Sequence, residues 1–192
     1  MRSYHNCSLC HLIFVPAEYH VTDDAEKAIY DLHQNSPEDE GYRKFLNRLL
    51  IPLCNKLAPN AQGLDFGCGP GPAIKPMLEA QGFTVNNYDI YYYKQENVLQ
   101  KKYDFITTTE AIEHFNQPRK ELELLDSLLR SGGYLGIMTK RPTSLEAFSR
   151  WHYKNDQTHI CFFSEKTFQW IASAFNYQIE FPGPDTVIMK KM

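Results

Sequence analysis

A short glycine-rich segment, LDFGCGPGP at residues 64–72, constrains the fold of this chain most. It follows a short apolar run and precedes a helical pattern that ends near Gly82. Only glycine readily tolerates positive φ angles and the close approach of a ligand to bare backbone. Gly67, Gly69 and Gly71 therefore predict a sharp turn from a strand into a helix, with a ligand site at the turn.

Apolar runs alternate with helical patterns along the rest of the chain. Strands are expected at 83–90, 103–109 and 133–139, each apolar enough to be buried on both faces. Alternation of strands and helices implies a parallel sheet with crossover connections. Two last strand-like runs, 177–181 and 186–190, are separated by a short Pro-Gly turn that requires an antiparallel hairpin. The predicted fold is an α/β sheet, mostly parallel, with an antiparallel C-terminal hairpin.

Four helices are expected outside the glycine segment. Asp23 and Glu26 resemble a capping box that starts a first helix, which should end at a break near Asn35. A longer helical pattern follows, and Pro52 should kink or divide it. Ser164 can cap a helix that runs to about residue 174. Another helix carries a single apolar stripe: Leu122, Leu125, Leu128 and Leu129.

Length and charge limit the function classes. A chain of 192 residues is long enough for one core, so we expect an N-terminal extension at 1–37 and one domain at 38–192. The net charge is −3 and the 20 Lys and Arg residues are scattered, which disfavours a nucleic-acid partner. No run approaches the roughly 20 apolar residues that cross a bilayer, and the first residues lack the apolar run of a secretory signal. We expect a cytoplasmic monomer or homodimer without a membrane partner.

Two carboxylates flank the glycine turn. Asp65 lies directly before it, and Asp89 lies at the end of the next expected strand, where an acidic side chain can bind ribose hydroxyls. A dinucleotide fingerprint would place glycine or alanine at position 72, which is Pro72 here. Asp65 would repel a pyrophosphate but would attract a sulfonium or an amino group. The pattern favours a cationic ligand that carries adenosine over a dinucleotide.

Four segments carry a resemblance to a known family: LDFGCGPGP, YDI, YDFITTTEAIEHF and LLRSGGYLGIMT. In this order and spacing, the chain resembles class I methyltransferases that depend on S-adenosylmethionine (SAM), over roughly residues 38–192. The resemblance implies a Rossmann-like sheet with helices on both faces, and SAM as the cofactor. It implies that Asp89 holds the ribose, that Ile90 borders the adenine and that Glu110 lies beneath the cofactor. The cofactor-binding residues that it implies are Asp65, Phe66, Gly67, Cys68, Gly69, Gly71, Asp89, Ile90, Thr109, Glu110 and Ala111. Few residues remain between Asp89 and Lys102, so the third strand and helix of the family should be abbreviated.

Methyl transfer from a sulfonium is an in-line displacement, for which alignment and exclusion of water matter most and a base is optional. His114 follows one expected strand, and Tyr153, Asp156 and His159 lie in the long polar and aromatic loop after the next. Ligands in such sheets bind beyond the carboxyl ends of the strands, so these four residues are the candidates for acceptor contacts, with His159 the preferred base. The alternative is that they only tie the loop to itself by hydrogen bonds.

The run WHYKNDQTHICFFSEKTF further resembles a subgroup similar to ubiquinone- or menaquinone-type methylases, which often carries a zinc ribbon ahead of the domain. Cys7 and Cys10 have the spacing of a zinc knuckle and look like the second half of that ribbon. We prefer a truncated remnant without metal. The alternatives are a site shared between two chains, or a metal completed by His5 and His11 or by His20. The five cysteines form an odd set, and we expect free thiols.

The expected function is a SAM-dependent methyltransferase that acts on an unidentified small molecule. A non-catalytic SAM-binding module is the alternative, because function resides in the site and not in the fold. An NAD(P)-linked oxidoreductase is a third interpretation, which Pro72 disfavours.

Overall fold

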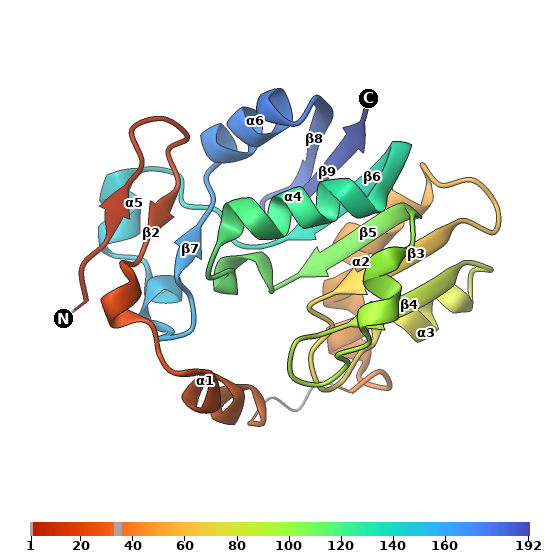
Figure 1. Ribbon diagram of the computed structural model, residues 1–192, viewed down its shortest axis with the longest axis horizontal. Coiled ribbons are helices and arrows are strands. Elements are labelled where there is room, and N and C mark those ends of the chain that lie inside the picture. The colour runs from red at the N-terminus through yellow and green to blue at the C-terminus, as the bar shows by residue number, and fades with distance from the viewer. Residues whose placement is uncertain (1, 33–35) are drawn as a thin grey trace.

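A six-stranded sheet forms the centre of the computed structural model, which describes residues 2–32 and 36–192 (Figure 1). The strand order is β4-β3-β5-β6-β9-β8. These strands are β3 (Gln62–Phe66), β4 (Thr84–Tyr88), β5 (Tyr103–Thr109), β6 (Leu129–Met138), β8 (Tyr177–Gly183) and β9 (Thr186–Lys191). The strands from β4 to β6 pair in parallel, and β9 is antiparallel to both β6 and β8. The predicted mixed sheet with its antiparallel C-terminal hairpin is confirmed.

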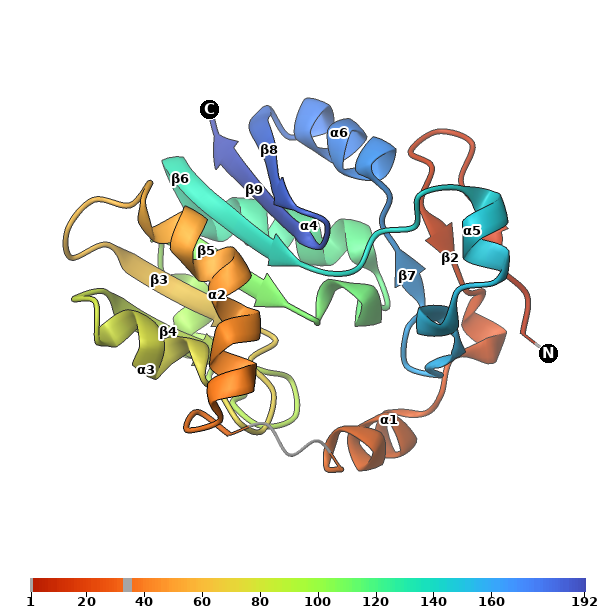
Figure 2. The same ribbon diagram turned by 180° about the vertical axis from the view of Figure 1, so that it is seen from behind.

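Helices cover both faces of the sheet, as Figures 1 and 2 show from opposite sides. On one face lie α2 (Glu40–Cys54) and α3 (Ile74–Glu79), and on the other lie α4 (Pro118–Leu128) and α6 (Glu165–Ala174). Phe105 packs in the core of the first face and its neighbour Ile106 in the core of the second. This alternation follows from the pleat, which points successive side chains of a strand to opposite faces. The buried face of each helix is thus held against the sheet.

A second, three-stranded antiparallel sheet joins the N-terminal segment to the later part of the chain. It consists of β1 (His5–Asn6), β2 (Ile13–Phe14) and β7 (Cys161–Phe162), with β2 in the middle. The sequence did not predict these short strands. Next to this sheet, the Arg2 guanidinium donates hydrogen bonds to the carbonyl oxygens of Lys154, Asp156 and Gln157. The predicted boundary at residue 37 stays a prediction, although this sheet links the two sides of it.

Three local expectations need correction. The cap of α1 (Asp23–Tyr30) is Thr22, whose side chain accepts a hydrogen bond from the backbone N–H of Ala25, and not Asp23. Pro52 does not divide α2, which continues to its end at Cys54, and the other expectation for this proline, a kink, stays a prediction. Leu129 belongs to β6 and not to the α4 stripe, because the chain becomes extended at this residue. The expected break near Asn35 lies outside the described residues.

The segment between β4 and β5 is abbreviated, as expected. It contains the 3-10 helix η2 (Glu96–Gln100), whose Val98 is buried, and β4 forms the edge of the sheet. The remaining short helices are η1 (Ala17–Tyr19), η3 (Ile112–His114), α5 (Leu145–Ser149) and η4 (His152–Asn155). Within residues 2–32 and 36–192, no helix is both long and apolar enough to cross a bilayer.

Candidate functional site

A cavity of about 590 Å³ lies at the carboxyl ends of β3, β4 and β5. Its volume falls in the range typical of small-molecule sites, and its position is the usual one in open α/β sheets. All the residues expected to bind the cofactor line it except Gly71. These lining residues are Asp65, Phe66, Gly67, Cys68, Gly69, Asp89, Ile90, Thr109, Glu110 and Ala111. Their role in binding stays a prediction, but the fold brings them to one place.

The glycine turn exposes backbone to this cavity. Gly67 and Gly69 both have positive φ angles, of 76° and 63°. A Cβ on Gly67 would lie 2.6 Å from the Cβ of Ala111, whereas a Cβ on Gly69 would meet nothing within 4 Å. Gly67 is therefore required for the close approach of two chain segments. Gly69 instead presents its backbone to open space that a ligand can fill.

Asp89 holds the glycine turn against β4. Its Oδ2 accepts a hydrogen bond of 2.9 Å from the backbone N–H of Gly69. Its Oδ1 accepts from the backbone N–H groups of Tyr91 at 2.9 Å and of Tyr92 at 3.1 Å. A carboxylate has about four acceptor positions, so Asp89 can accept one further hydrogen bond from a ligand in the cavity.

Asp65 is a buried carboxyl group on the cavity wall. Its Oδ1 accepts a hydrogen bond of 2.8 Å from the hydroxyl of Thr107. Burial raises the pKa of Asp65 to about 7, and the nearby charge of Asp89 adds to this effect. A cation that enters the cavity would favour the charged form of Asp65. Together with the open backbone of Gly69, this carboxyl group suits a ligand that carries a positive charge.

Glu110 has a strained backbone at the end of β5. Its φ angle is +47°, a left-handed conformation that is uncommon outside glycine and is concentrated at functional sites. Its Oε2 accepts a hydrogen bond of 3.3 Å from the hydroxyl of Tyr153, which also donates to Oε1 of Glu113. Burial and the nearby charge of Glu113 raise the pKa of Glu110, and burial raises the pKa of Glu113. Two carboxyl groups thus share one phenol beside the cavity.

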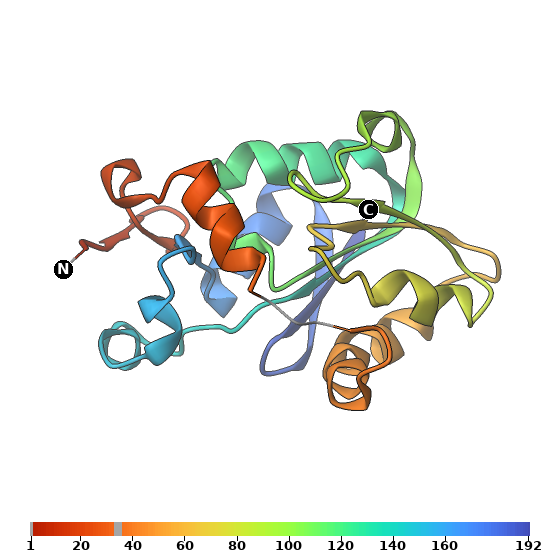
Figure 3. The ribbon, with the colours of Figure 1, turned by 90° about the horizontal axis from the view of Figure 1, so that it is seen from below.

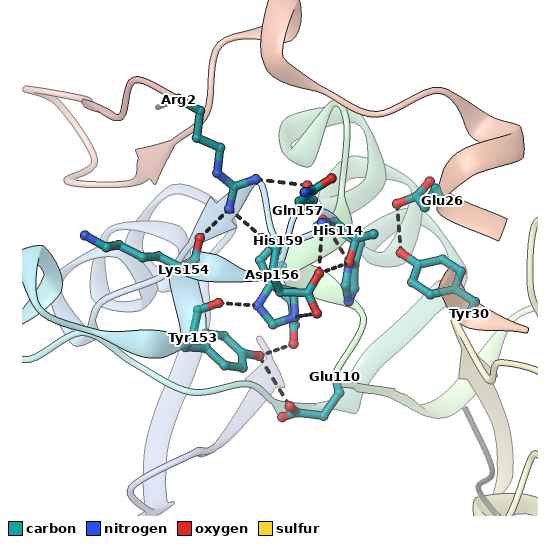
Figure 4. A network of polar contacts seen from close by, with 12 residues as sticks. Arg2, Glu26, Tyr30, Glu110, His114, Tyr153, Lys154, Asp156, Gln157 and His159 are labelled. Atoms are coloured by element: carbon teal, nitrogen blue, oxygen red, sulfur yellow. Dashed lines mark hydrogen bonds and ion pairs between the residues drawn. The ribbon is translucent and has the colours of Figure 1, made fainter. Parts of the chain in front are cut away.

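The four acceptor-side candidates lie close together beside the cavity (Figure 4). His114, Asp156 and His159 line it, whereas Tyr153 lies buried behind the wall. The Nδ1 of His159 bonds to the carbonyl oxygen of Tyr153 at 2.7 Å, and burial lowers the pKa of His159 to about 4. Asp156 accepts hydrogen bonds from the backbone N–H and the hydroxyl of Thr158. For this residue, the alternative expectation of hydrogen bonds within the loop is therefore met.

Sequence reasoning missed a set of cavity residues that come from α1 and α2: Glu26, Tyr30, Tyr42 and Phe45. Figure 3 shows α1 between the small sheet and α2. The hydroxyls of Tyr30 and Tyr91 each donate a hydrogen bond of 2.7 Å to the carboxylate of Glu26. Because the first helix was assigned to a separate extension, its contribution was not expected. Glu26 and Tyr30 lie one helical turn apart, and this spacing was the available signal.

Cys7 and Cys10 lie in the turn that joins β1 and β2, and all five cysteines are free thiols. Hydrogen bonds from the backbone N–H groups of Cys10 and Leu9 lower the pKa of Cys7. Among the residues that the structure describes, no third metal-ligating side chain joins this pair, and the Nε2 of His20 bonds to the carbonyl oxygen of Val15. The proposed completion by nearby histidines is not found, and the zinc-ribbon remnant stays a prediction.

Comparison with known proteins identifies similar sequences and folds. Residues 35–180 match the family model described as a methyltransferase domain. No curated protein matches the chain. A SAM-dependent methyltransferase structure from Archaeoglobus fulgidus has a TM-score of 0.62 at 21% identity, and the match covers 88% of this chain and 100% of that one.

Two further solved structures have the same fold. The 1,6-didemethyltoxoflavin-N1-methyltransferase from Burkholderia thailandensis, bound to 1,6-didemethyltoxoflavin and S-adenosylhomocysteine (SAH), has a TM-score of 0.57 at 15% identity. Its match covers 98% of this chain and 99% of that chain. A SAM-dependent methyltransferase from Methanosarcina mazei has a TM-score of 0.57 at 16% identity, with 73% of this chain and 97% of that one covered. At these identities the likeness concerns the fold.

Proposed function

The chain belongs to the methyltransferase domain family, and we propose that it transfers a methyl group from SAM to a small-molecule acceptor in the cavity beyond β3, β4 and β5. One observation carries the proposal. The open backbone of Gly69 lies in the same cavity as two carboxyl groups, Asp65 and Asp89. This arrangement suits a cation that carries a ribose, and it opposes a pyrophosphate.

In this proposal each carboxyl group binds a different part of SAM. Asp89 accepts a hydrogen bond from a ribose hydroxyl through its remaining acceptor position, while it continues to hold the Gly69 turn. Asp65 loses its proton and attracts the positively charged end of the cofactor. Ile90, which is 53% exposed at the cavity edge, borders the adenine. These proposed contacts agree with the roles that the family resemblance implies for Asp89, Asp65 and Ile90.

Bound SAM supplies a methyl group on a positively charged sulfur, and the chain aligns the acceptor with it. The helices α1 and α2 contribute to the cavity wall and help to exclude water. Glu110 is the proton acceptor that the geometry favours, because its Oε1 has no hydrogen-bond partner among the described residues. His159 is neutral, but its pKa of about 4 makes it a weaker base.

The acceptor is a small molecule in this proposal, since the net charge of −3 and the acidic cavity oppose a nucleic-acid backbone. The cytoplasmic location and the monomeric or homodimeric state stay predictions of the sequence. Aromatic rings line the cavity beside the carboxyl groups, among them Tyr30, Tyr42, Phe45 and Phe115. They favour an acceptor that is flat or partly apolar.

Titration calorimetry with SAM, SAH and NAD tests the proposal. We expect SAM and SAH to bind with one site per chain and NAD not to bind. An acceptor screen with isotope-labelled SAM then measures transfer. Binding of NAD alone would contradict the proposal, and binding of SAM without transfer to any acceptor would favour a non-catalytic module.

A further inference from the structure

Three metal-ligating side chains converge beside the cavity. Glu113 and His114 come from η3, and His159 comes from the loop that follows η4. One potential ligand atom from each lies within 4.8 Å of the others. The rings of His114 and His159 have centroids 4.9 Å apart. In the described part of the chain, no other place brings three such residues together.

Hydrogen bonds to the backbone hold both imidazole rings in one orientation. The Nδ1 of His114 lies 2.9 Å from the carbonyl oxygen of Thr158, and the Nδ1 of His159 lies 2.7 Å from that of Tyr153. A carbonyl oxygen only accepts hydrogen bonds, so each Nδ1 carries the proton and each neutral ring has its lone pair on Nε2. Histidines that bind metals almost always donate their other N–H to such a partner.

Glu113 supplies a carboxylate with one unused oxygen. The side chain is fully buried, and its Oε1 accepts the hydroxyl of Tyr153. Its Oε2 has no hydrogen-bond partner among residues 2–32 and 36–192. An unpartnered polar atom in the interior costs free energy unless another group satisfies it. Tyr153 therefore supports two members of the cluster, Glu113 through its hydroxyl and His159 through its carbonyl group.

We propose that Glu113, His114 and His159 bind a divalent transition-metal ion. Two imidazoles and one carboxylate suit Mn²⁺, Fe²⁺, Co²⁺ or Zn²⁺ better than Ca²⁺ or Mg²⁺, which prefer oxygen ligands. Ligand atoms up to 4.8 Å apart reach a metal–ligand distance of roughly 2.1 Å after shifts of less than about 1 Å each. The two histidines line the cavity and Glu113 lies behind them, so open coordination positions face the cavity.

This site also defines an acceptor class, an inference that rests on the proposed methyl transfer. A hydroxyl group bound to the ion has a lowered pKa and can lose its proton at neutral pH. The proton passes to Glu110 or to water, the oxygen forms a bond to the methyl carbon, and the bond between that carbon and sulfur breaks to leave neutral SAH. The geometry thus points to an acceptor with an oxygen nucleophile.

Titration of the full chain with Co²⁺, in the absence of SAM, tests the site. We expect one Co²⁺ per chain with a visible absorption band, and displacement of it by Zn²⁺. His114→Asn and Glu113→Gln should each weaken binding at least about tenfold. His152→Asn, which changes an exposed histidine of the preceding η4, is the matched control and should bind Co²⁺ normally. Replacement of both Cys7 and Cys10 by serine tests whether the cysteine pair binds the metal instead, and this double variant should bind Co²⁺ normally.

Two outcomes would overturn the proposal. The first is that the chain binds none of Co²⁺, Mn²⁺ and Zn²⁺ stoichiometrically. The second is that His114→Asn and Glu113→Gln bind the metal normally while the double cysteine variant does not. Circular dichroism verifies that each variant is folded. Because His114 is only partly buried, its variant keeps the test valid if Glu113→Gln does not fold. Metal binding without SAM binding would reject the methyl transfer but keep the metal site, and the reverse result would reject the metal site alone.

Discussion

Replacement of Asp65 by asparagine should change the stability of the protein and its affinity for SAM in opposite directions. Asparagine has nearly the same shape, and its Oδ1 can still accept the hydrogen bond from Thr107. The substitution removes a carboxyl group that is only 2% exposed. We therefore expect a more stable protein at alkaline pH that binds SAM less tightly.

The size of the stability effect follows from the pKa of Asp65. Burial raises this pKa from 3.8 to about 7, and each pKa unit corresponds to about 1.4 kcal/mol. The folded state therefore binds more protons than the unfolded state between these two values, and stability falls as the pH rises through this window. Above pH 7 the ionised carboxylate costs up to about 4 kcal/mol, which Asp65→Asn relieves. Below pH 4 the difference between the two proteins should vanish.

Urea unfolding of both proteins across pH 4 to pH 8, combined with calorimetric titration of SAM, measures the two effects. We expect the stability difference to grow with pH, and SAM affinity to fall about tenfold or more in the variant. Asp24→Asn, at an exposed position outside the cavity, is the control and should bind SAM normally. A stability difference that is independent of pH, or an unchanged SAM affinity in Asp65→Asn, would refute the reasoning.

Three other substitutions, one of them with a matched control, test separate parts of the site. Gly67→Ala should destabilise the protein by about 2 to 4 kcal/mol, because the new Cβ would lie 2.6 Å from that of Ala111 at a positive φ. Gly82→Ala, also at positive φ but with open space around it, should cost only about 1 to 2 kcal/mol, and equal melting temperatures of the two variants would argue against the clash. Asp89→Ala should lower SAM affinity at least about tenfold in calorimetry, since the ribose contact and the hold on the turn are both lost, and wild-type affinity would exclude the ribose role. Tyr153→Phe should reduce the free energy of unfolding by about 1 to 3 kcal/mol, because the carboxyl groups of Glu110 and Glu113 lose their donor, and unchanged urea unfolding would contradict these hydrogen bonds.

Features that depend on neighbouring residues could be predicted from the sequence. The glycine turn, the long apolar strands and the Ser164 cap of α6 each depend on local spacing, and the structure places them as expected. Leu129 shows the limit of this approach, because its spacing continues the helical stripe although its backbone is already extended. The choice of strand at this residue depends on pairing with Tyr103 in β5.

The parts that the sequence did not predict depend on contacts between distant segments. Two-residue strands such as β2 and β7 have no periodic pattern, so their pairing through Ile13 and Phe162 could not be found. Glu113 and His114 were visible beside the expected strand end, but only the fold brings His159 next to them. The same holds for Tyr153, which lies 40 residues from Glu113 in the chain.

A crystal structure of the protein with SAH tests the central claim most directly. The account predicts electron density for SAH in the cavity beyond β3, β4 and β5, with a ribose hydroxyl at the Asp89 carboxylate and the amino group beside Asp65. Density for SAH at another surface, or a cavity that side chains close in the presence of saturating SAH, would contradict it.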